Sequence, residues 1–249
     1  MKSILSFSLF LMVFTILSSA QNSDNYVTIK GYITDYQNNP LDSVAVGWQD
    51  KKFTKSIAET TTDKNGFYEI KLEKGRYYSV SALNMNKYIV TGSTLPKKDL
   101  RLEFWGWNFI ADRDTVFNMQ YDRMEVYGIN VFRIQGGTPA FTIYCRPMSL
   151  TRTLDYGLPT KGRVRLAPSP ENLKINVTIN GEEVKVLSKQ EVEEYWSETE
   201  STNAYLLTVA LPKIKSGLPY SIFRIQMTDL ENGDRGEATY FMEKKEYIE

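Results

Sequence analysis

Histidine is absent from this chain of 249 residues, and cysteine occurs only once, as Cys145. Without histidine the chain cannot build histidine-based triads, histidine general bases or the usual zinc centres of peptidases. A lone cysteine forms no internal disulfide, and with no basic partner such as histidine it is not expected to be an activated nucleophile. We therefore predict a non-catalytic protein without metal or cofactor, in which Cys145 is a small buried side chain of a strand.

An excess of either charge is also lacking, since 30 basic residues face 30 acidic ones. Nucleic-acid-binding proteins concentrate positive charge on one face, so nucleic acid is not an expected partner. Two of the acidic residues could still form a catalytic pair, as in glycosidases. The sequence does not single out such a pair, and a carboxylate-dependent glycosidase is kept as a minor alternative.

Long apolar runs are missing except at the N-terminus. There Lys2 precedes the uncharged segment Ile4–Leu17, and the small residues Ser18, Ser19 and Ala20 follow. This order predicts a signal peptide over residues 1–20. No cysteine stands at the cleavage point and no later segment has the length of a transmembrane helix, so we expect a soluble exported protein. Its expected location is the periplasm, the cell surface or the extracellular space.

What the chain does contain is a series of short alternating segments rich in aromatic and β-branched residues, which are typical of β-strands. In the first half these include residues 27–34, 44–48, 54–62 and 68–72. Asp63-Lys64-Asn65-Gly66 lies between the last two segments and predicts a tight hairpin loop, with Gly66 at positive φ. The pattern predicts an all-β fold.

The first half resembles the carboxypeptidase regulatory-like domain, a transthyretin-like β-sandwich. The matching motifs are G-x-I-x-D at Gly31–Asp35, N-P-L at Asn39–Leu41, T-D-x-N-G-F-Y at Thr62–Tyr68 and K-G-R-Y-Y at Lys74–Tyr78. The resemblance implies a fold rather than an activity. In the enzymes that give the family its name, such a domain accompanies a separate zinc peptidase domain, which this chain lacks. Related sandwiches bind carbohydrate.

The second half is also rich in strands. Asn180-Gly181 separates two alternating segments and predicts a hairpin. Ser188–Glu191 has the spacing of a helix capping box, and apolar residues follow at helical offsets, so we predict a short helix over about 188–196. The last two segments, within 220–242, resemble the closing hairpin of an immunoglobulin-like sandwich.

The predicted architecture is two tandem β-sandwich domains, the second with a short helix. We place the signal peptide at 1–20, the carboxypeptidase regulatory-like sandwich at 21–122 and the immunoglobulin-like sandwich at 123–249. No linker rich in proline, glycine or serine marks the boundary. We therefore expect the two domains to be rigidly apposed.

Three features are candidates for a ligand-binding role. Trp105 and Trp107 belong to an aromatic cluster that could stack on sugar rings or instead fill the contact between the domains. Arg146 could bind a carboxylate or phosphate, or form a structural ion pair. Asp229–Asp234 carries oxygen ligands but lacks the order of an EF-hand loop, so it predicts a turn.

The predicted function is a non-catalytic module that binds a carbohydrate or an envelope protein, with Trp105, Trp107 and Arg146 as ligand-binding residues. The alternative is a structural or adhesin-like subunit that assembles through exposed strand edges. Asp42–Val44 and Asp114–Val116 are similar to the O-glycosylation sites of Bacteroidota, which favours a bacterial cell envelope. The sequence leaves the oligomeric state open.

Overall fold

A computed structural model describes residues 25–52, 56–89, 94–157 and 162–244. The predicted signal peptide lies outside these residues. Strands dominate the described chain and the only α-helix in it is short, which confirms the all-β fold class. Within the same ranges, no helix has the length and apolar character needed to cross a membrane.

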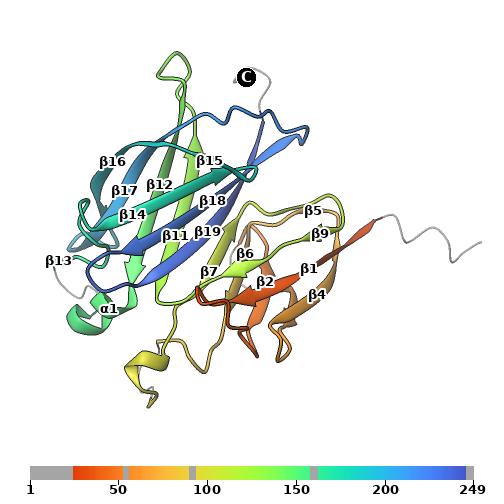
Figure 1. Cartoon of the computed structure of the whole chain (residues 1–249), viewed down its shortest axis with the longest axis horizontal. Helices are drawn as coiled ribbons and strands as arrows, with labels where there is room; N and C mark the ends of the chain where they lie inside the picture. Colours follow the sequence, from red (N-terminus) through yellow and green to blue (C-terminus); the bar gives the residue numbers. More distant parts are fainter. Residues whose placement is uncertain (1–24, 53–55, 90–93, 158–161, 245–249) are drawn as a thin grey trace, which may run out of the picture.

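The first half of the chain consists of short strands and one 3₁₀ turn (Figure 1). They are β1 (Tyr26–Thr34), β2 (Ala45–Gln49), β3 (Ser56–Thr61), β4 (Phe67–Glu73), β5 (Gly75–Arg76), β6 (Ser79–Leu83), η1 (Lys97–Asp99), β7 (Phe104–Trp107), β8 (Ile110–Ala111), β9 (Thr115–Val116) and β10 (Met119–Gln120).

The second half has longer strands and the α-helix. Its elements are β11 (Met124–Phe132), β12 (Ala140–Ser149), α1 (Leu150–Tyr156), β13 (Gly162–Val164), β14 (Leu173–Ile179), β15 (Glu182–Val184), β16 (Val186–Tyr195), β17 (Glu200–Ala210), β18 (Tyr220–Asp229) and β19 (Arg235–Glu243).

One eight-stranded sheet joins the two halves, in the order β15-β14-β18-β19-β7-β6-β2-β3. The link is a parallel pairing of β19, the last strand, with β7 of the first half, in which Ala238 lies opposite Trp105 and Tyr240 opposite Trp107. One part of this sheet faces β11, β12, β17 and β16, and the other faces β1, β4, β9 and β10 (Figure 1). The halves are therefore two sandwiches built on a shared sheet.

Each sandwich has its own apolar core. In the first half Trp48, Tyr68, Phe104 and Phe109 are among the core residues, and in the second half Met124, Phe223 and Ile225 are. The strand β19 contributes to both cores, with Ala238 in the second and Phe241 in the first. Because burial of apolar area is the main favourable term in folding, β19 ties the stability of each half to the other.

The turn at Asp63–Gly66 forms as predicted, but its pairing differs. Gly66 has φ of 73° and its N–H donates to the Asp63 carbonyl at 2.9 Å. The flanking strands do not pair with each other, because β3 pairs with β2 and β4 pairs with β1. The turn therefore carries the chain from the eight-stranded sheet to the opposite sheet, and the prediction of a hairpin is wrong. The Asn180-Gly181 hairpin is confirmed, since β14 and β15 pair antiparallel with both turn residues at positive φ.

The helix predicted over 188–196 is wrong. Residues 188–195 belong to β16, which pairs antiparallel with β17 from Val186 to Tyr195, and Trp196 follows this strand. Every residue of β16 except Leu187 has a partner on β17, and this pairing outweighs the local helical pattern. The helix of the second half is instead α1, which begins after Ser149, whose side chain accepts a hydrogen bond from the Arg152 N–H. It ends at Gly157, which has φ of 74°.

Candidate functional site

The two sandwiches meet at a cavity of about 610 Å³, here called the junction pocket. This volume lies within the ordinary range of small-molecule sites. The pocket receives residues from the segment before β7, from β11, β12 and α1, and from the end of β16. Its lining residues are Tyr88, Ile89, Leu102, Glu103, Glu125, Arg146, Met148, Thr153, Gly157 and Trp196.

Strand alternation brings these side chains to one side. On β11, Met124 and Val126 lie in the core of the second half, so Glu125 and Tyr127 project from the opposite face. The neighbouring strand β12 places Arg146 opposite Tyr127 and Met148 opposite Glu125. The junction pocket therefore lies on the outer face of the sheet.

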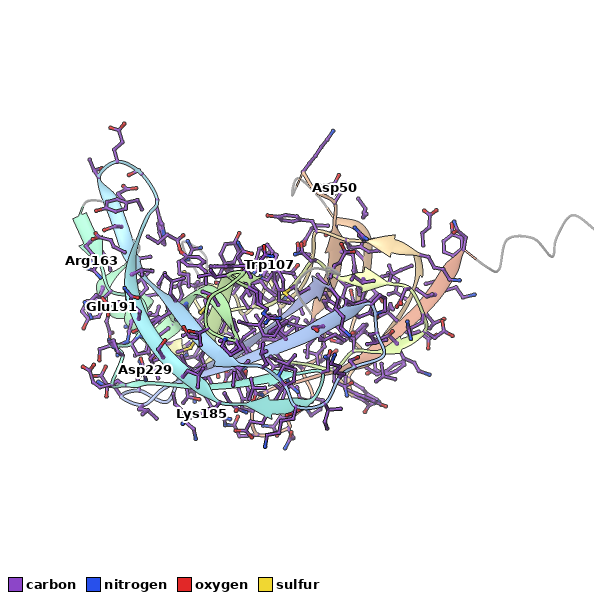
Figure 2. The ribbon with its side chains drawn as sticks, turned by 90° about the horizontal axis from the view of Figure 1, so that it is seen from above. Asp50, Trp107, Arg163, Lys185, Glu191 and Asp229 are labelled. Carbon is purple, nitrogen blue, oxygen red and sulfur yellow. The ribbon has the colours of Figure 1, made fainter. Side chains whose placement is uncertain are left out.

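An aromatic cluster lies beside the pocket. The rings of Trp105 and Trp107 stack with centroids 5.2 Å apart, and Tyr127 meets them edge-on at 5.4 and 5.1 Å. Tyr78 meets Trp107 edge-on at 5.7 Å. Figure 2 shows Trp107 between two parts of the chain that rise on either side, one with Arg163 and Glu191 and the other with Asp50. The cluster packs where the two sandwiches join.

Trp105 and Trp107 are only 7 % and 6 % exposed and belong to the core of the second half. Little of either ring is open to a ligand, so their role as binding residues stays a prediction. Trp105 acts at the pocket through its indole, whose Nε1–H donates to Glu103 Oε1 at 2.8 Å.

Arg146 is in the pocket, with most of its guanidinium already engaged. Its Cζ lies 4.7 Å from the ring centre of Tyr127 and 5.3 Å from that of Trp196. One terminal nitrogen forms an ion pair with Glu194, which also accepts a hydrogen bond from Tyr144. The buried Nε has no hydrogen-bond partner. Arg146 thus holds Trp196 against the sheet by cation–π contact.

Two carboxyl groups face the same cavity. Glu125 is 4 % exposed, and burial, together with the charge of Glu103, raises its pKa to about 8, against the opposing effects of Arg146 and the Trp105 indole. Burial also raises the pKa of Glu103, while hydrogen bonds from Trp105 and Tyr88 oppose the rise. At neutral pH Glu125 is therefore mostly a neutral carboxylic acid, which can donate as well as accept a hydrogen bond.

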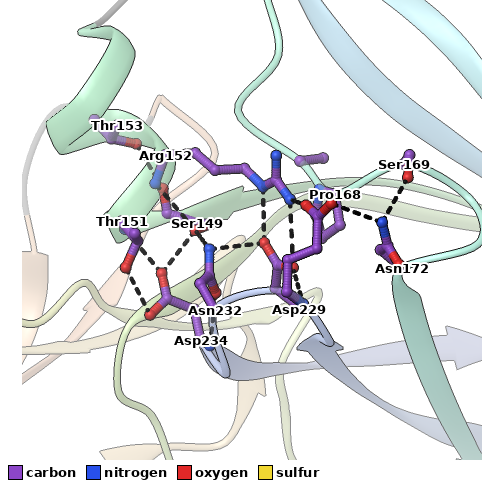
Figure 3. Close-up of polar contacts among 12 residues, drawn as sticks. Ser149, Thr151, Arg152, Thr153, Pro168, Ser169, Asn172, Asp229, Asn232 and Asp234 are labelled. Atoms are coloured by element: carbon purple, nitrogen blue, oxygen red, sulfur yellow. Dashed lines mark hydrogen bonds and ion pairs between the residues drawn. The ribbon is translucent and has the colours of Figure 1, made fainter.

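The Asp229–Asp234 turn forms as predicted, and its two aspartates bind protein groups (Figure 3). Asp229 accepts from Arg152 Nε at 2.7 Å and from Asn232 Nδ2 at 2.9 Å. Asp234 accepts from Arg123 Nε at 3.0 Å and from the Ser149 hydroxyl at 2.6 Å. Among the residues described, no cluster of three or more acidic or cysteine side chains is suited to a metal. The turn instead anchors α1, which lines the junction pocket.

Cys145 is fully buried in β12, as predicted, and burial raises the pKa of its thiol. The pocket residues that the sequence analysis missed are Glu103, Glu125, Tyr88 and Trp196. A signal for two of them was present, because Glu103 alternates with Trp105 and Trp107, and Glu125 alternates with Tyr127. Alternation shows that residues share a face, but it does not show which faces meet.

Substituting Glu125 by glutamine tests the burial of this carboxyl. The ordinary glutamate pKa of 4.5 applies to the unfolded chain and about 8 to the folded one. Between these values the folded state holds a proton that the unfolded state has lost, so stability falls as pH rises. We expect Glu125→Gln to remove this contribution, so that its melting temperature relative to wild type rises from pH 5 to pH 8. Thermal unfolding of both proteins at pH 5 and pH 8 measures this difference in melting temperature.

Glu183→Gln, the same change at an exposed site on β15, is the matched control and should follow wild type at both pH values. An unchanged difference between Glu125→Gln and wild type over this pH range would show that Glu125 is not buried as a neutral acid.

Neither a scan against protein-family models nor a search of curated protein sequences returned a match. Membership of the carboxypeptidase regulatory-like family therefore stays a prediction. Among solved structures, a DUF3823 family protein from Bacteroides ovatus shows 9 % identity and a TM-score of 0.27, with 86 % of this chain and 97 % of that one covered. A DUF3823 family protein from Parabacteroides merdae shows 10 % identity and a TM-score of 0.27, with 88 % of this chain and 99 % of that one covered. The major pilin subunit of Bacillus cereus shows 14 % identity and a TM-score of 0.27, with 88 % of this chain and 68 % of that one covered. Likeness at this level establishes neither a shared fold nor a function.

Proposed function

We propose that this chain is an exported, non-catalytic binding module that holds a carbohydrate in the junction pocket. The observation that carries the proposal is the composition of this one cavity, in which the aromatic side chains of Tyr88 and Trp196 accompany the carboxyl groups of Glu103 and Glu125. Sugars present apolar C–H faces that pack on aromatic rings, and hydroxyls that exchange hydrogen bonds with carboxyl groups.

Trp196 gives the sharpest test of this proposal. Truncation of Trp196 to alanine removes an aromatic wall of the pocket and leaves the strand pairing of β16 intact, because Trp196 follows the end of that strand. We expect affinity for the glycan identified in an array screen of residues 21–249 to fall about tenfold or more, which is about 1.4 kcal/mol. Calorimetric titration measures the loss.

Tyr195→Ala is the matched control, since this neighbouring ring is 65 % exposed and does not line the pocket. It should bind the glycan as wild type does. Equal affinity of Trp196→Ala and wild type would contradict the proposed site. Release of reducing ends during the screen would favour the glycosidase alternative, with Glu103 and Glu125 as the carboxylate pair.

A second candidate function is assembly through a strand edge. Among the described strands β3 pairs with β2 alone, and Ile57 on β3 is 52 % exposed. An outer strand of this kind can add a strand from another chain. Sedimentation velocity over a range of protein concentrations tests this assembly. Wild-type oligomers that are lost in Ile57→Lys would favour assembly through β3. A wild-type monomer at all concentrations would contradict it.

A further inference from the structure

The two carboxyl groups of the junction pocket lie in one electrostatic environment. Glu103 stands directly before β7 and Glu125 is near the start of β11, and the Trp105 indole interacts with both. Two carboxyl groups that line one cavity and interact with the same indole cannot both ionise without strong repulsion. One proton shared by the pair relieves this repulsion.

Among the described residues, the groups that act on Glu125 include a single cation. The titratable groups that face Glu125 are Glu103, the tyrosines Tyr88 and Tyr127, and Arg146. Arg146 is the only cation of this group, and it is already paired with Glu194. The acids of the pocket and its rim outnumber the cation, so an anionic ligand would enter against repulsion.

We propose that Glu103 and Glu125 share one proton and bind two neighbouring hydroxyl groups of a neutral sugar, Glu103 accepting from one hydroxyl and Glu125 donating to the other. This inference rests on the proposed function and adds the ligand class to it. Neutral sugars fit the pocket, whereas uronic acids, which carry a carboxylate, do not.

The proposal fixes the sign of a pH effect. Above a pH of about 8 Glu125 loses its proton, so it no longer donates, and the pocket then carries a second negative charge. Binding of a neutral sugar must therefore weaken as the solution becomes alkaline. A ligand bound through an ammonium group would behave in the opposite way, because it would displace the shared proton and gain affinity as Glu125 ionises.

The test is a glycan array that carries neutral and uronic-acid oligosaccharides of matched length, probed with residues 21–249 at pH 6.5 and pH 9.5. We expect binding to neutral glycans at pH 6.5, little binding to the uronic acids, and a loss of about tenfold at pH 9.5. Glu125→Gln keeps a neutral donor in place, so its affinity should be the same at both pH values. Glu183→Gln, on the far edge strand β15, should lose affinity as wild type does.

The possible failures are distinct. Equal or better binding of uronic acids, or affinity that rises with pH, would overturn the shared-proton inference and leave carbohydrate binding standing. Absence of binding to every glycan at both pH values would overturn the proposed function and the inference with it. ¹³C NMR titration of the glutamate carboxyl carbons in the ligand-free wild type adds an independent measurement. We expect one of the two carboxyls to keep its proton at pH 7, and full ionisation of both at pH 6 would overturn the inference.

Discussion

Replacement of Gly236 by alanine is expected to lower the free energy of unfolding by about 3 kcal/mol, near the upper end for overpacking of a core. Gly236 lies in β19 against Met124 at the start of β11. A Cβ atom at this position would stand 1.9 Å from the Met124 carbonyl oxygen and 2.6 Å from its carbon. These are backbone atoms, so no rotation of a side chain relieves the contact and the two strands must separate.

The corresponding shift in melting temperature is about 6 to 12 °C for a chain of this size. Gly217→Ala is the control, because its added Cβ meets no atom within 4 Å. We expect this variant to unfold within about 0.5 kcal/mol of wild type. Chemical denaturation of both variants measures the difference, and a Gly236→Ala protein as stable as Gly217→Ala would show that β11 and β19 do not meet as described.

The close contact at Gly236 illustrates what the sequence could not reveal. Local signals identified most strands and the Asn180-Gly181 turn, because alternation and turn chemistry depend on neighbouring residues alone. The approach of β19 to β11, and its parallel pairing with β7, join residues more than a hundred positions apart. No local pattern encodes such a pairing, so the shared eight-stranded sheet was not predicted.

The misplaced helix has a related cause. The capping-box spacing at Ser188–Glu191 predicted a helix there, and no helix was predicted over Leu150–Tyr156. The structure places the first in β16 and the helix α1 in the second. The choice between them depends on β17, which pairs with β16 over its length, and on the Asp229–Asp234 turn, which holds α1.

Only part of the candidate site was predicted, because the pocket also depends on contacts between distant segments of the chain. Arg146 was identified from its chemistry, and it lines the junction pocket. Glu103 and Glu125 could not be distinguished from the other acidic residues, because their burial arises only where the two sandwiches meet. Alternation in the sequence predicts which side chains share one face of a strand. It does not predict that these faces meet at the junction pocket, because that contact depends on the shared sheet.

Asp234→Ala is expected to destabilise the protein by about 3 to 5 kcal/mol, the usual loss when one partner of a buried ion pair is removed. The Asp234 side chain is 2 % exposed, and its carboxylate accepts from Arg123 at 3.0 Å, from the Ser149 hydroxyl at 2.6 Å and from the Thr151 N–H at 2.8 Å. The variant leaves a partly buried guanidinium and the fully buried Ser149 hydroxyl without this acceptor. Urea denaturation monitored by tryptophan fluorescence measures the change.

Asp155→Ala, an exposed aspartate on the same helix, is the matched control and should be close to wild type. The two variants also separate the structural role of the turn from binding. The bonds of Asp234 to Ser149 and Thr151 fix the first turn of α1, and Thr153 in the middle of this helix and Gly157 just after it line the junction pocket. A helix held less firmly should widen the pocket, so Asp234→Ala should weaken glycan binding even under conditions in which the variant remains folded. Full stability without Asp234 would mean that the ion pair of Arg152 with Asp229 and the apolar contacts of α1 are enough to hold the helix.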